Sequence, residues 1–298
     1  MQKISIIVCT VNRADFLSGC LLSILYQSTN ENKPEIIVVD NCSTYNTNAV
    51  VLEPRFEMLE YFFEVKVGLS HARNRGAKEA KGEWLCYIDD DARLHPGYIE
   101  RALWVIENYN FDCFGGMYYA WYPFGKPKWI DNDFGTKISL RDTVGPIDVP
   151  ELSGGNFLIK KEVFEKAGGF PVDYGMAGER IGYGEEDFLQ RRLLEIGYKL
   201  GFDPELKIDH AVLKHKLKLG WHLKSKFAQG RDGEFLQKKS FPFALLLFFR
   251  SMIGVLLKRF PYCTIRLIFN QQYYLQNYIF DLLSPIAVRL GQIAFYLK

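Results

Sequence analysis

The apolar run EWLCYI at residues 83–88 is followed by three consecutive carboxylates, Asp89, Asp90 and Asp91. Adjacent carboxylates repel one another unless a cation neutralises them, and a preceding strand would fix where they point. Mg²⁺ and Mn²⁺ take oxygen ligands, usually one or two protein carboxylates completed by diphosphate oxygens and water. The cluster therefore predicts a divalent-cation site. An acidic turn at a strand end, ahead of a helix that starts near Pro96, is the alternative that the residues leave open.

Two further groups could work with this cluster. His210, in the segment DPELKIDH, would supply another metal ligand if its strand returned to the same edge, although a lone histidine is more often structural. Glu185, Glu186 and Asp187 begin a segment whose apolar residues recur at helical spacing, at Leu189, Leu193 and Ile196. A carboxylate there could accept a proton. Carboxylates also favour the positive end of a helix, by about 0.3–1 kcal/mol each, without any catalytic role.

Three short apolar runs are expected to carry these groups as strands: residues 3–10 (KISIIVCT), 35–40 (EIIVVD) and 83–88. Helical spacing follows the first run, and Ser70 can cap a short helix that reaches about Ala80. Alternating strands and helices predict a parallel sheet with right-handed crossovers, whose polar strand ends line one crevice. No dinucleotide-binding or phosphate-loop glycine pattern follows the first run, which disfavours an ordinary dehydrogenase or P-loop enzyme.

Charge is distributed unevenly along the chain. The net charge is +2, but residues 201–298 hold 15 Lys and Arg against 6 Asp and Glu, which leaves 22 against 29 in the first 200 residues. A basic, apolar tail on an acidic body fits an anionic membrane surface better than a nucleic acid. A solvated basic helix is the plain alternative.

The tail contains a strongly apolar stretch, residues 241–257, that is interrupted by Arg250. Its 17 residues are short for a bilayer core about 30 Å thick, so we expect an interfacial or re-entrant segment. Basic residues that suit anionic headgroups flank it: Lys238 and Lys239 before it, Lys258 and Arg259 after it. A buried helical hairpin or a homo-oligomer interface is the alternative.

The cysteines bear on the compartment of the protein. All six are scattered without paired spacing, and Cys9 and Cys86 lie inside apolar runs, which is typical of free thiols in a reducing compartment. The short apolar run at the start is followed at once by polar residues, unlike a signal peptide. We therefore expect no signal peptide and a peripheral location at the cytoplasmic face of a membrane.

Six segments follow one another across about residues 3–215: SIIVCTVNR, IIVVDNCS, GLSHARNRG, YIDDDARLHPGY, SGGNFLIKKEVFEKAGGF and YGEEDFLQRRLLEIGY. In this order they resemble the opening pattern, second-strand motif, Arg-Asn-x-Gly segment, Asp-x-Asp motif, acceptor-side segment and acidic helix start of inverting glycosyltransferases of family 2. The resemblance implies the GT-A fold, a doubly wound, mostly parallel α/β sheet with a helical, apolar and basic C-terminal appendage.

The expected division of the chain follows from this resemblance and from the composition. Residues 1–215 would form the GT-A catalytic domain, and residues 216–298 a membrane-associating or oligomerising tail. Residues 115–150, rich in Gly, Pro and aromatic residues, are expected to be a loop-rich region on the acceptor side.

The resemblance also implies a site. Its donor-binding residues would be Thr10, Asn12, Arg13, Asp40, Arg73, Asp89, Asp90, Gly154, Gly155 and Asn156. Among them Asp40 would bind the base, usually uracil or thymine, and residues 154–156 would let the backbone approach the donor sugar. Asp89, Asp91 and His210 would hold Mn²⁺ or Mg²⁺, with Asp91 as the main carboxylate.

Inverting transfer needs a carboxylate that accepts the proton of the acceptor hydroxyl. The family commonly has Glu-Asp at the acidic helix, where this chain has Glu185, Glu186 and Asp187. Leu189 and Arg192 match the family's Leu and Arg, and counting back from them places the base at Glu186. Asp187 is the second candidate.

The expected activity is inverting transfer of a sugar from a UDP- or dTDP-linked donor to a saccharide or lipid-linked acceptor in glycan biosynthesis. The Gln-x-x-Arg-Trp motif of the family's processive synthases is absent from the sequence, so transfer of one or a few sugars is expected. Two other classes stay open. A nucleotidyltransferase that makes nucleotide sugars normally needs a glycine-rich basic loop, which VNRADFLSGC is not. A non-catalytic sugar-nucleotide-binding scaffold would bind UDP and metal without turnover.

Overall fold

The structure, a computed structural model, describes residues 3–29, 32–44, 47–139, 141–237 and 240–297. The chain divides into two compact units. Unit 1 comprises Met1–Trp121, Gly135–Gly178 and Glu185–Ala211, and unit 2 comprises Tyr122–Phe134, Glu179–Gly184 and Val212–Lys298. Unit 2 therefore includes two short segments that precede residue 215. Lys238 and Lys239, expected to flank the apolar tail, lie outside the described residues.

Unit 1 is built on a sheet that has nine strands in the described part of the chain, in the order β3-β2-β1-β4-β8-β6-β9-β5, with β7 also paired to β9. The strands are β1 (Ile4–Thr10), β2 (Glu35–Asp40), β3 (Glu60–Phe63), β4 (Trp84–Asp89), β5 (Ala92–Leu94), β6 (Cys113–Trp121), β7 (Gly145–Ile147), β8 (Asn156–Lys160) and β9 (Leu200–Ala211). The first four run parallel, as predicted. The other half is mixed, because β8 joins β4 and β6 in antiparallel pairs that need no crossover helix.

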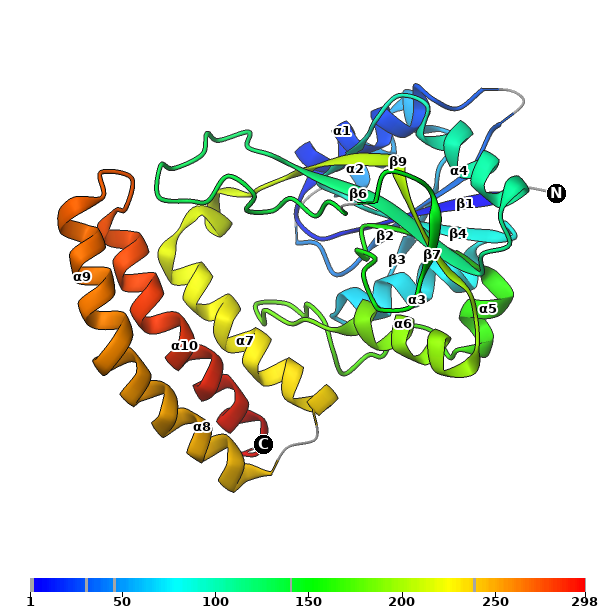
Figure 1. Cartoon of the computed structure of the whole chain (residues 1–298). Coiled ribbons are helices and arrows are strands. Elements are labelled where there is room, and N and C mark those ends of the chain that lie inside the picture. The colour runs from blue at the N-terminus through cyan, green and yellow to red at the C-terminus, as the bar shows by residue number, and fades with distance from the viewer. Residues whose placement is uncertain (1–2, 30–31, 45–46, 140, 238–239, 298) are drawn as a thin grey trace. The chain divides into compact units, whose positions relative to one another are not determined.

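Helices cover both faces of this sheet (Figure 1). They are α1 (Ala14–Leu25), α2 (Thr47–Val51), η1 (Pro54–Phe56), α3 (Leu69–Glu79), α4 (Tyr98–Asn108), α5 (Lys161–Lys166) and α6 (Glu185–Ile196). Side chains of β1 alternate between the faces, so that Ile6 and Val8 pack in one core with α1 and α4. Ile7 packs in the other core with α3, α5 and α6. The predicted α/β fold class is thus confirmed.

The direction of strand addition reverses next to β1. From β1 the chain adds β2 and then β3 on one side, and α3 then leads back to β4 on the other side. The neighbouring strands β1 and β4 therefore form a topological switch point. In open α/β sheets, ligands bind beyond the carboxyl ends of the strands at such a point.

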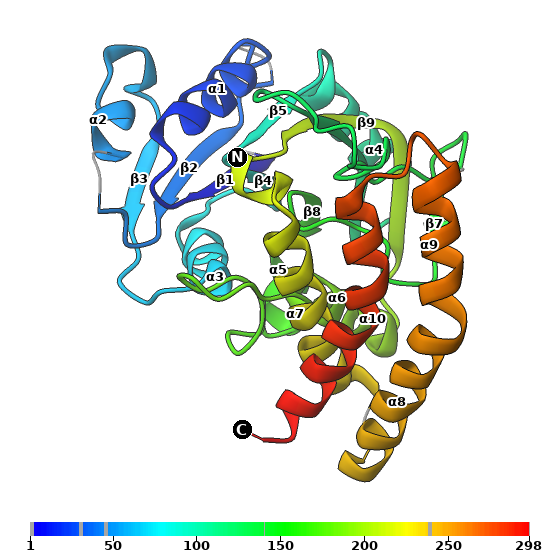
Figure 2. The same cartoon turned by 90° about the vertical axis from the view of Figure 1, so that its left-hand side faces the viewer.

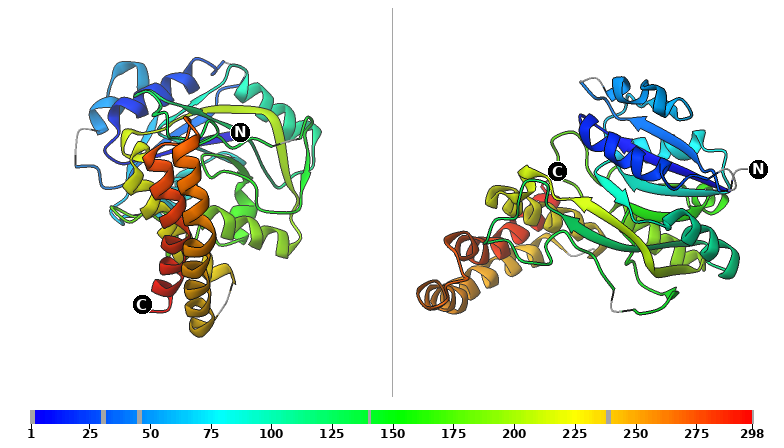
Figure 3. Two further views of the ribbon diagram at one scale, coloured as in Figure 1. Left: turned by 60° about the vertical axis from the view of Figure 1, so that its left-hand side comes forward. Right: turned by 90° about the horizontal axis from the view of Figure 1, so that it is seen from above.

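Unit 2 is mainly helical. Its elements are η2 (Lys214–Leu217), α7 (Leu219–Gln237), α8 (Phe241–Gly254), the π-helical η3 (Val255–Arg259), α9 (Phe260–Phe269) and α10 (Leu275–Phe295). α8, η3 and α9 form one continuous helix, and α10 packs along α7 and α8 (Figures 2 and 3). The π-helical turn lies just before Pro261, which lacks the N–H that a regular helix would use there.

Two helices of unit 2 are long and apolar enough to cross a membrane, namely Phe241–Phe269 and Leu275–Phe295. The first contains 29 residues, so the helix is much longer than the apolar stretch at residues 241–257 that the sequence suggested. Arg250, Lys258 and Arg259 nevertheless have exposed side chains along it.

Candidate active site

The carboxyl ends of β1, β2 and β4 bring the predicted polar residues to the switch point. In the sheet register Thr10 is paired with Asp40, and Cys9 with Asp89. Residues that are about 30 and 80 positions apart in sequence are thereby neighbours across adjacent strands, whose spacing is about 4.8 Å.

Asp89, Asp91 and His210 form a group that could hold a metal ion. One ligand atom from each lies within 4.8 Å of the others. Strand pairing produces this arrangement, because β5 follows Asp91 directly and pairs Ala92 with His210 of β9. His210 Nε2 lies 3.1 Å from Asp91 Oδ1, and its buried Nδ1 has no hydrogen-bond partner among the described residues. Two carboxylates and an imidazole are a suitable donor set for Mn²⁺.

Asp90 is bound by the last residue of β1 and by the loop that follows it. Its carboxylate accepts hydrogen bonds from Thr10 Oγ1 at 2.7 Å and from Arg13 Nη1 at 2.8 Å. Burial raises the pKa of Asp90 to about 6, although Arg13 opposes the shift. Arg13 Nη1 also lies 3.2 Å from Asp91 Oδ2. Arg13 therefore partly neutralises two of the three consecutive carboxylates.

Asp40 and Asn12 order the loops beside the switch point. Asp40 accepts hydrogen bonds from the Ser43 N–H at 2.8 Å and from the Tyr61 hydroxyl at 2.9 Å. Burial and the bond to Asp40 raise the pKa of Tyr61 to about 12. Asn12 has a φ of 54°, and its side-chain oxygen accepts from the Thr44 N–H at 2.8 Å. Both predicted donor-binding residues thus lie at the carboxyl ends of β1 and β2 and hold the loops that follow.

Arg73 of α3 connects the candidate metal ligands (Asp89, Asp91 and His210, the metal group) with Glu185 at the start of α6. Its buried guanidinium donates to Glu185 Oε1 at 3.0 Å and to Asp89 Oδ1 at 3.4 Å. The Tyr118 hydroxyl of β6 donates to the other oxygen of Asp89 at 3.0 Å. Sequence reasoning did not single out Tyr118, because its segment was expected to be a loop. The uncharged, aromatic-rich run CFGGMYYAW could have indicated β6.

The turn before β8 packs directly against these charges. A Cβ on Gly155 would lie 2.1 Å from Asp89 Oδ2, and one on Gly154 would lie 2.8 Å from the Arg73 guanidinium. Only glycine allows this approach. The Asn156 side chain is fully buried: it accepts from the Tyr98 hydroxyl at 2.6 Å and donates to the carbonyls of Met117 and Leu206. Any contact between Asn156 and a nucleotide-sugar donor would have to come from its backbone.

The three carboxylates that begin α6 differ in burial. Glu185 is only 5% exposed, and burial, reinforced by the neighbouring Glu186 carboxylate, raises the pKa of Glu185 to about 8. Glu186 is half-buried, and its Oε2 has no hydrogen-bond partner in the described part of the chain. Burial also raises the pKa of Asp187. The Oε2 atom of Glu186 is thus a buried oxygen that no described hydrogen bond uses.

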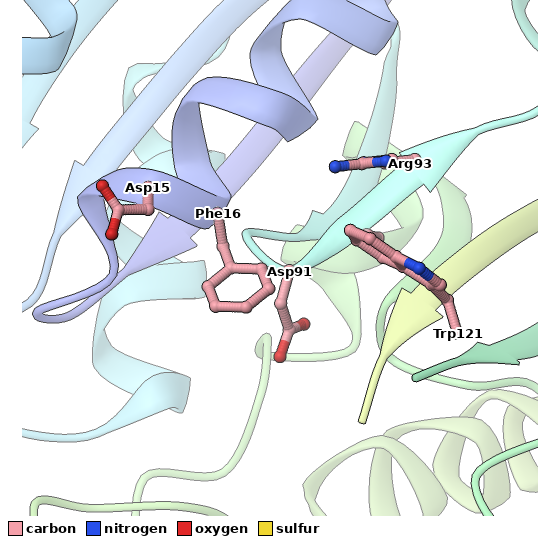
Figure 4. A pocket seen from close by; sticks show the side chains of 6 residues that line it. Asp15, Phe16, Asp91, Arg93 and Trp121 are labelled. Carbon is pink, nitrogen blue, oxygen red and sulfur yellow. The ribbon is translucent and has the colours of Figure 1, made fainter. Parts of the chain in front are cut away.

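A pocket of about 90 Å³ lies beside Asp91. Phe16 of α1 and Trp121 of β6 form its walls, with Arg93 and the Asp91 carboxylate at its edges (Figure 4). The Arg93 guanidinium lies 3.8 Å from the centre of the Trp121 ring, a cation–π contact that fixes its orientation. Neither Arg93 nor Trp121 was predicted as a site residue.

Residues 5–168 match the family model for glycosyl transferase family 2, which is more than half of the chain. The chain belongs to this family, and its class is that of the glycosyltransferases with the GT-A fold. The fold and the family that the motifs resembled are therefore confirmed.

Relatives and a solved structure agree with this assignment. The chain is 26% identical to the glycosyltransferase AglE of Haloferax volcanii over 67% of its own length and 64% of the relative. It is 23% identical to the glucosyl-dolichyl phosphate glucuronosyltransferase of the same organism, over 77% of its length and 75% of the relative. The mannosyltransferase PcManGT of Pyrobaculum calidifontis, solved with GDP-Man and Mn²⁺, shares the fold with a TM-score of 0.59 at 20% identity, covering 80% of this chain and 65% of that one.

Proposed function

We propose that this chain is an inverting, non-processive glycosyltransferase that moves a sugar from a nucleoside-diphosphate sugar to a hydroxyl of a saccharide or lipid-linked acceptor. The observation that carries the proposal is the convergence of Asp89, Asp91 and His210 at the switch point, joined by Arg73 to the start of α6. A cation site for a diphosphate and a carboxylate for proton transfer are then close together, as transfer requires.

The donor side of the mechanism rests on the residues at the strand ends. Asp89, Asp91 and His210 would hold Mn²⁺ or Mg²⁺, which when bound neutralises negative charge on the leaving diphosphate. Asp40 and Asn12 order the loops that would receive the base and ribose, and Thr10 and Arg13 orient Asp90. Gly154 and Gly155 let the backbone before β8 pack against Arg73 and Asp89, and the donor sugar would lie next to this backbone.

The acceptor side rests on α6. Glu186 would accept the proton of the acceptor hydroxyl, because its Oε2 lacks a partner within the described residues whereas Glu185 is bound to Arg73. Asp187 is the second candidate for this role. A side chain one position along a helix points about 100° further round its axis, so only one of the two can face the acceptor.

The apolar tail supports a location at the cytoplasmic face of a membrane. Residues 1–215 would be the catalytic part and residues 216–298 the membrane-associating part, with a homo-oligomer interface as the other use of the tail. Arg250, Lys258 and Arg259 divide the long helix Phe241–Phe269 into short uncharged stretches, which favours a helix lying in the interface over one that crosses the bilayer. Such docking would bring the site near a lipid-linked acceptor.

The donor class is tested by incubating the protein with Mn²⁺ and a panel of UDP-, dTDP- and GDP-sugars and measuring release of the nucleoside diphosphate. Release from one donor, raised by an added saccharide or lipid-linked acceptor and abolished by EDTA, is the expected result. Consumption of a nucleoside triphosphate with release of pyrophosphate would instead identify a nucleotidyltransferase. Binding of UDP and Mn²⁺ without turnover of any donor would identify a scaffold.

The membrane proposal is tested by sedimentation with anionic liposomes. The full chain should pellet and a chain ending at Gln237 should remain in solution, with weaker binding at higher salt because headgroup charges are screened. If both chains pelleted equally, or if salt did not affect the binding, the tail would instead be a packing surface or an oligomer interface.

A further inference from the structure

The pocket beside Asp91 has no role in the mechanism proposed above. It lies wholly within unit 1 and is lined by Asp15 and Phe16 of α1, by Asp91, Ala92 and Arg93 in and before β5, and by Trp121 at the end of β6. Its volume of about 90 Å³ has room for several water molecules, since one water needs about 10–15 Å³ of such space. The pocket can therefore admit a ring-sized part of a ligand.

The walls of the pocket are aromatic and its edges are charged. The half-buried rings of Phe16 and Trp121 form the walls, and the edges carry the side chains of Asp15, Asp91 and Arg93 (Figure 4). A sugar ring has the matching pattern, because its C–H groups give it apolar faces while its hydroxyls lie around its edge. Aromatic faces attract such C–H groups, and charged side chains form strong hydrogen bonds with hydroxyls.

Arg93 holds the Trp121 wall in place. Its guanidinium lies 3.8 Å from the centre of the Trp121 ring, and a Cβ on Gly19 of α1 would lie 3.6 Å from its Nε and Nη2 atoms. The guanidinium therefore lies close to both α1 and Trp121. With other described residues its N–H groups form neither a hydrogen bond nor an ion pair. Arg93 thus orients an aromatic wall and keeps donors for the hydroxyls of a ligand.

The pocket is separate from the place of the donor sugar. That sugar would lie next to the backbone of residues 154–155, which packs against Asp89. The pocket instead adjoins Asp91, and among the described residues none from α6 lines it. A sugar ring in the pocket would therefore contact a residue of the metal group without being the ring whose hydroxyl meets Glu186.

We propose that Phe16, Arg93 and Trp121 form a subsite for a further sugar ring of the acceptor, beyond the ring that carries the reacting hydroxyl. This inference rests on the function proposed above and names its acceptor class, a saccharide of at least two rings. A ring held in the subsite adds binding energy without touching the base. It should therefore lower the KM of a longer acceptor more than it changes kcat.

Binding of saccharides is measured by saturation-transfer NMR on the full-length protein with UDP and Mg²⁺, because Mn²⁺ is paramagnetic. The ligands are the methyl glycosides of glucose, galactose, mannose and N-acetylglucosamine, each paired with a disaccharide of the same sugar. Wild type should bind at least one disaccharide about tenfold more tightly than the matching methyl glycoside. This difference is the contribution of the subsite.

The variants Phe16→Ala and Trp121→Ala should each remove this preference, about tenfold in affinity, whereas Trp121→Phe keeps an aromatic wall and should retain most of it. Arg93→Ala should weaken disaccharide binding about threefold. The matched control is Trp104→Ala, since Trp104 of α4 is also exposed and lies 4.1 Å from a guanidinium, that of Arg101, but does not line the pocket. Unfolding midpoints identify any variant that is simply unstable.

The affinity for UDP should stay within about twofold of wild type in the pocket variants, and with a disaccharide acceptor their KM should rise about tenfold. Three results would overturn the subsite: no saccharide binds to wild type, the preference survives in both Phe16→Ala and Trp121→Ala, or UDP binding is lost together with it. If wild type binds the disaccharide in a Trp121-dependent way but turns over no donor, the proposed function fails and the saccharide subsite stands.

Discussion

Unit 1 carries two runs of three consecutive carboxylates, one at the end of a strand and one at the start of a helix. In the strand-end run, Asp89 and Asp91 belong to the metal group with His210, while Asp90 is bound by Thr10 and Arg13. In the helical run, each carboxylate points about 100° from the previous one, so the three environments differ. Only Glu185 of this run is deeply buried, against Arg73.

The difference between the runs lies in how each is neutralised. The strand-end run lies against Arg13 and Arg73, which offset its charge, and His210 Nε2 contacts Asp91. Among the described residues the helical run has one close ion pair, from Arg73 to Glu185, while the charges of Lys137 and Arg191 also act on Asp187. The Oε2 atom of Glu186 has no hydrogen-bond partner there. Oriented carboxylates suit a cation, and a carboxylate with an unused oxygen suits proton transfer.

The largest expected effect comes from the strand-end run. Asp91→Asn removes the carboxylate that lies closest to His210, so binding of UDP in the presence of Mn²⁺ should fall below detection by calorimetry. Activity should fall by about 10³-fold or more, because neutralisation of the leaving group contributes several kcal/mol. EDTA should have the same effect on wild type. Binding of UDP that neither the variant nor EDTA weakens would place the metal elsewhere.

The next effect distinguishes the residues of the helical run. Glu186→Gln should lower kcat by about 10²–10⁴-fold and leave UDP affinity nearly unchanged, as expected for loss of a general base. Asp187→Asn should reduce kcat less. Turnover at saturating donor and acceptor decides between them, with unfolding midpoints as the control for stability. If Asp187→Asn is the inactive variant, the register is wrong by one residue and Asp187 is the base.

A smaller effect should come from the turn that packs against the strand-end run. In Gly155→Ala the added Cβ would lie 2.1 Å from Asp89 Oδ2, so Asp89 must move. We expect affinity for Mn²⁺ to fall about tenfold, within the 10–100-fold range typical of changes next to metal ligands. The matched control is Gly145→Ala, where an added Cβ meets no atom within 4 Å. Equal Mn²⁺ affinity in both variants would remove Asp89 from the metal group.

Much of the strand-end run could be predicted from sequence, and less of the helical run. β1, β2 and β4 are short, continuous apolar runs that end in polar residues, so their ends and the position of Asp91 follow from the local composition. The contact between Arg73 and Glu185 joins residues 112 positions apart and depends on the packing of α3 and α6 on one face of the sheet. No local pattern encodes such a contact, and the burial of Asn156 was missed for the same reason.

The smallest expected effect is a change in how the stability of the folded protein depends on pH, and it comes from Glu185. Its pKa is raised from 4.5 to about 8, so between these values the folded protein binds a proton that the unfolded chain does not. The stability that Glu185 contributes is therefore fully present below about pH 4.5 and is lost as pH rises through about 8. The glutamine of the Glu185→Gln variant cannot ionise, so this variant should not lose that stability as pH rises.

The measurement is the unfolding midpoint of wild type and Glu185→Gln between pH 5 and pH 9. As pH rises, the unfolding midpoint of the variant should increase relative to that of wild type by a few degrees. A stability difference of about 1 kcal/mol corresponds to about 2–4 °C in a protein of this size class. Asp90, whose pKa is also raised, is present in both proteins and cancels in the difference. Glu195→Gln, at an exposed position of α6, is the matched control and should follow wild type. If the difference between the two unfolding midpoints stayed constant across the pH range, Arg73 would be keeping Glu185 ionised. Both runs of carboxylates would then be neutralised by cations alone.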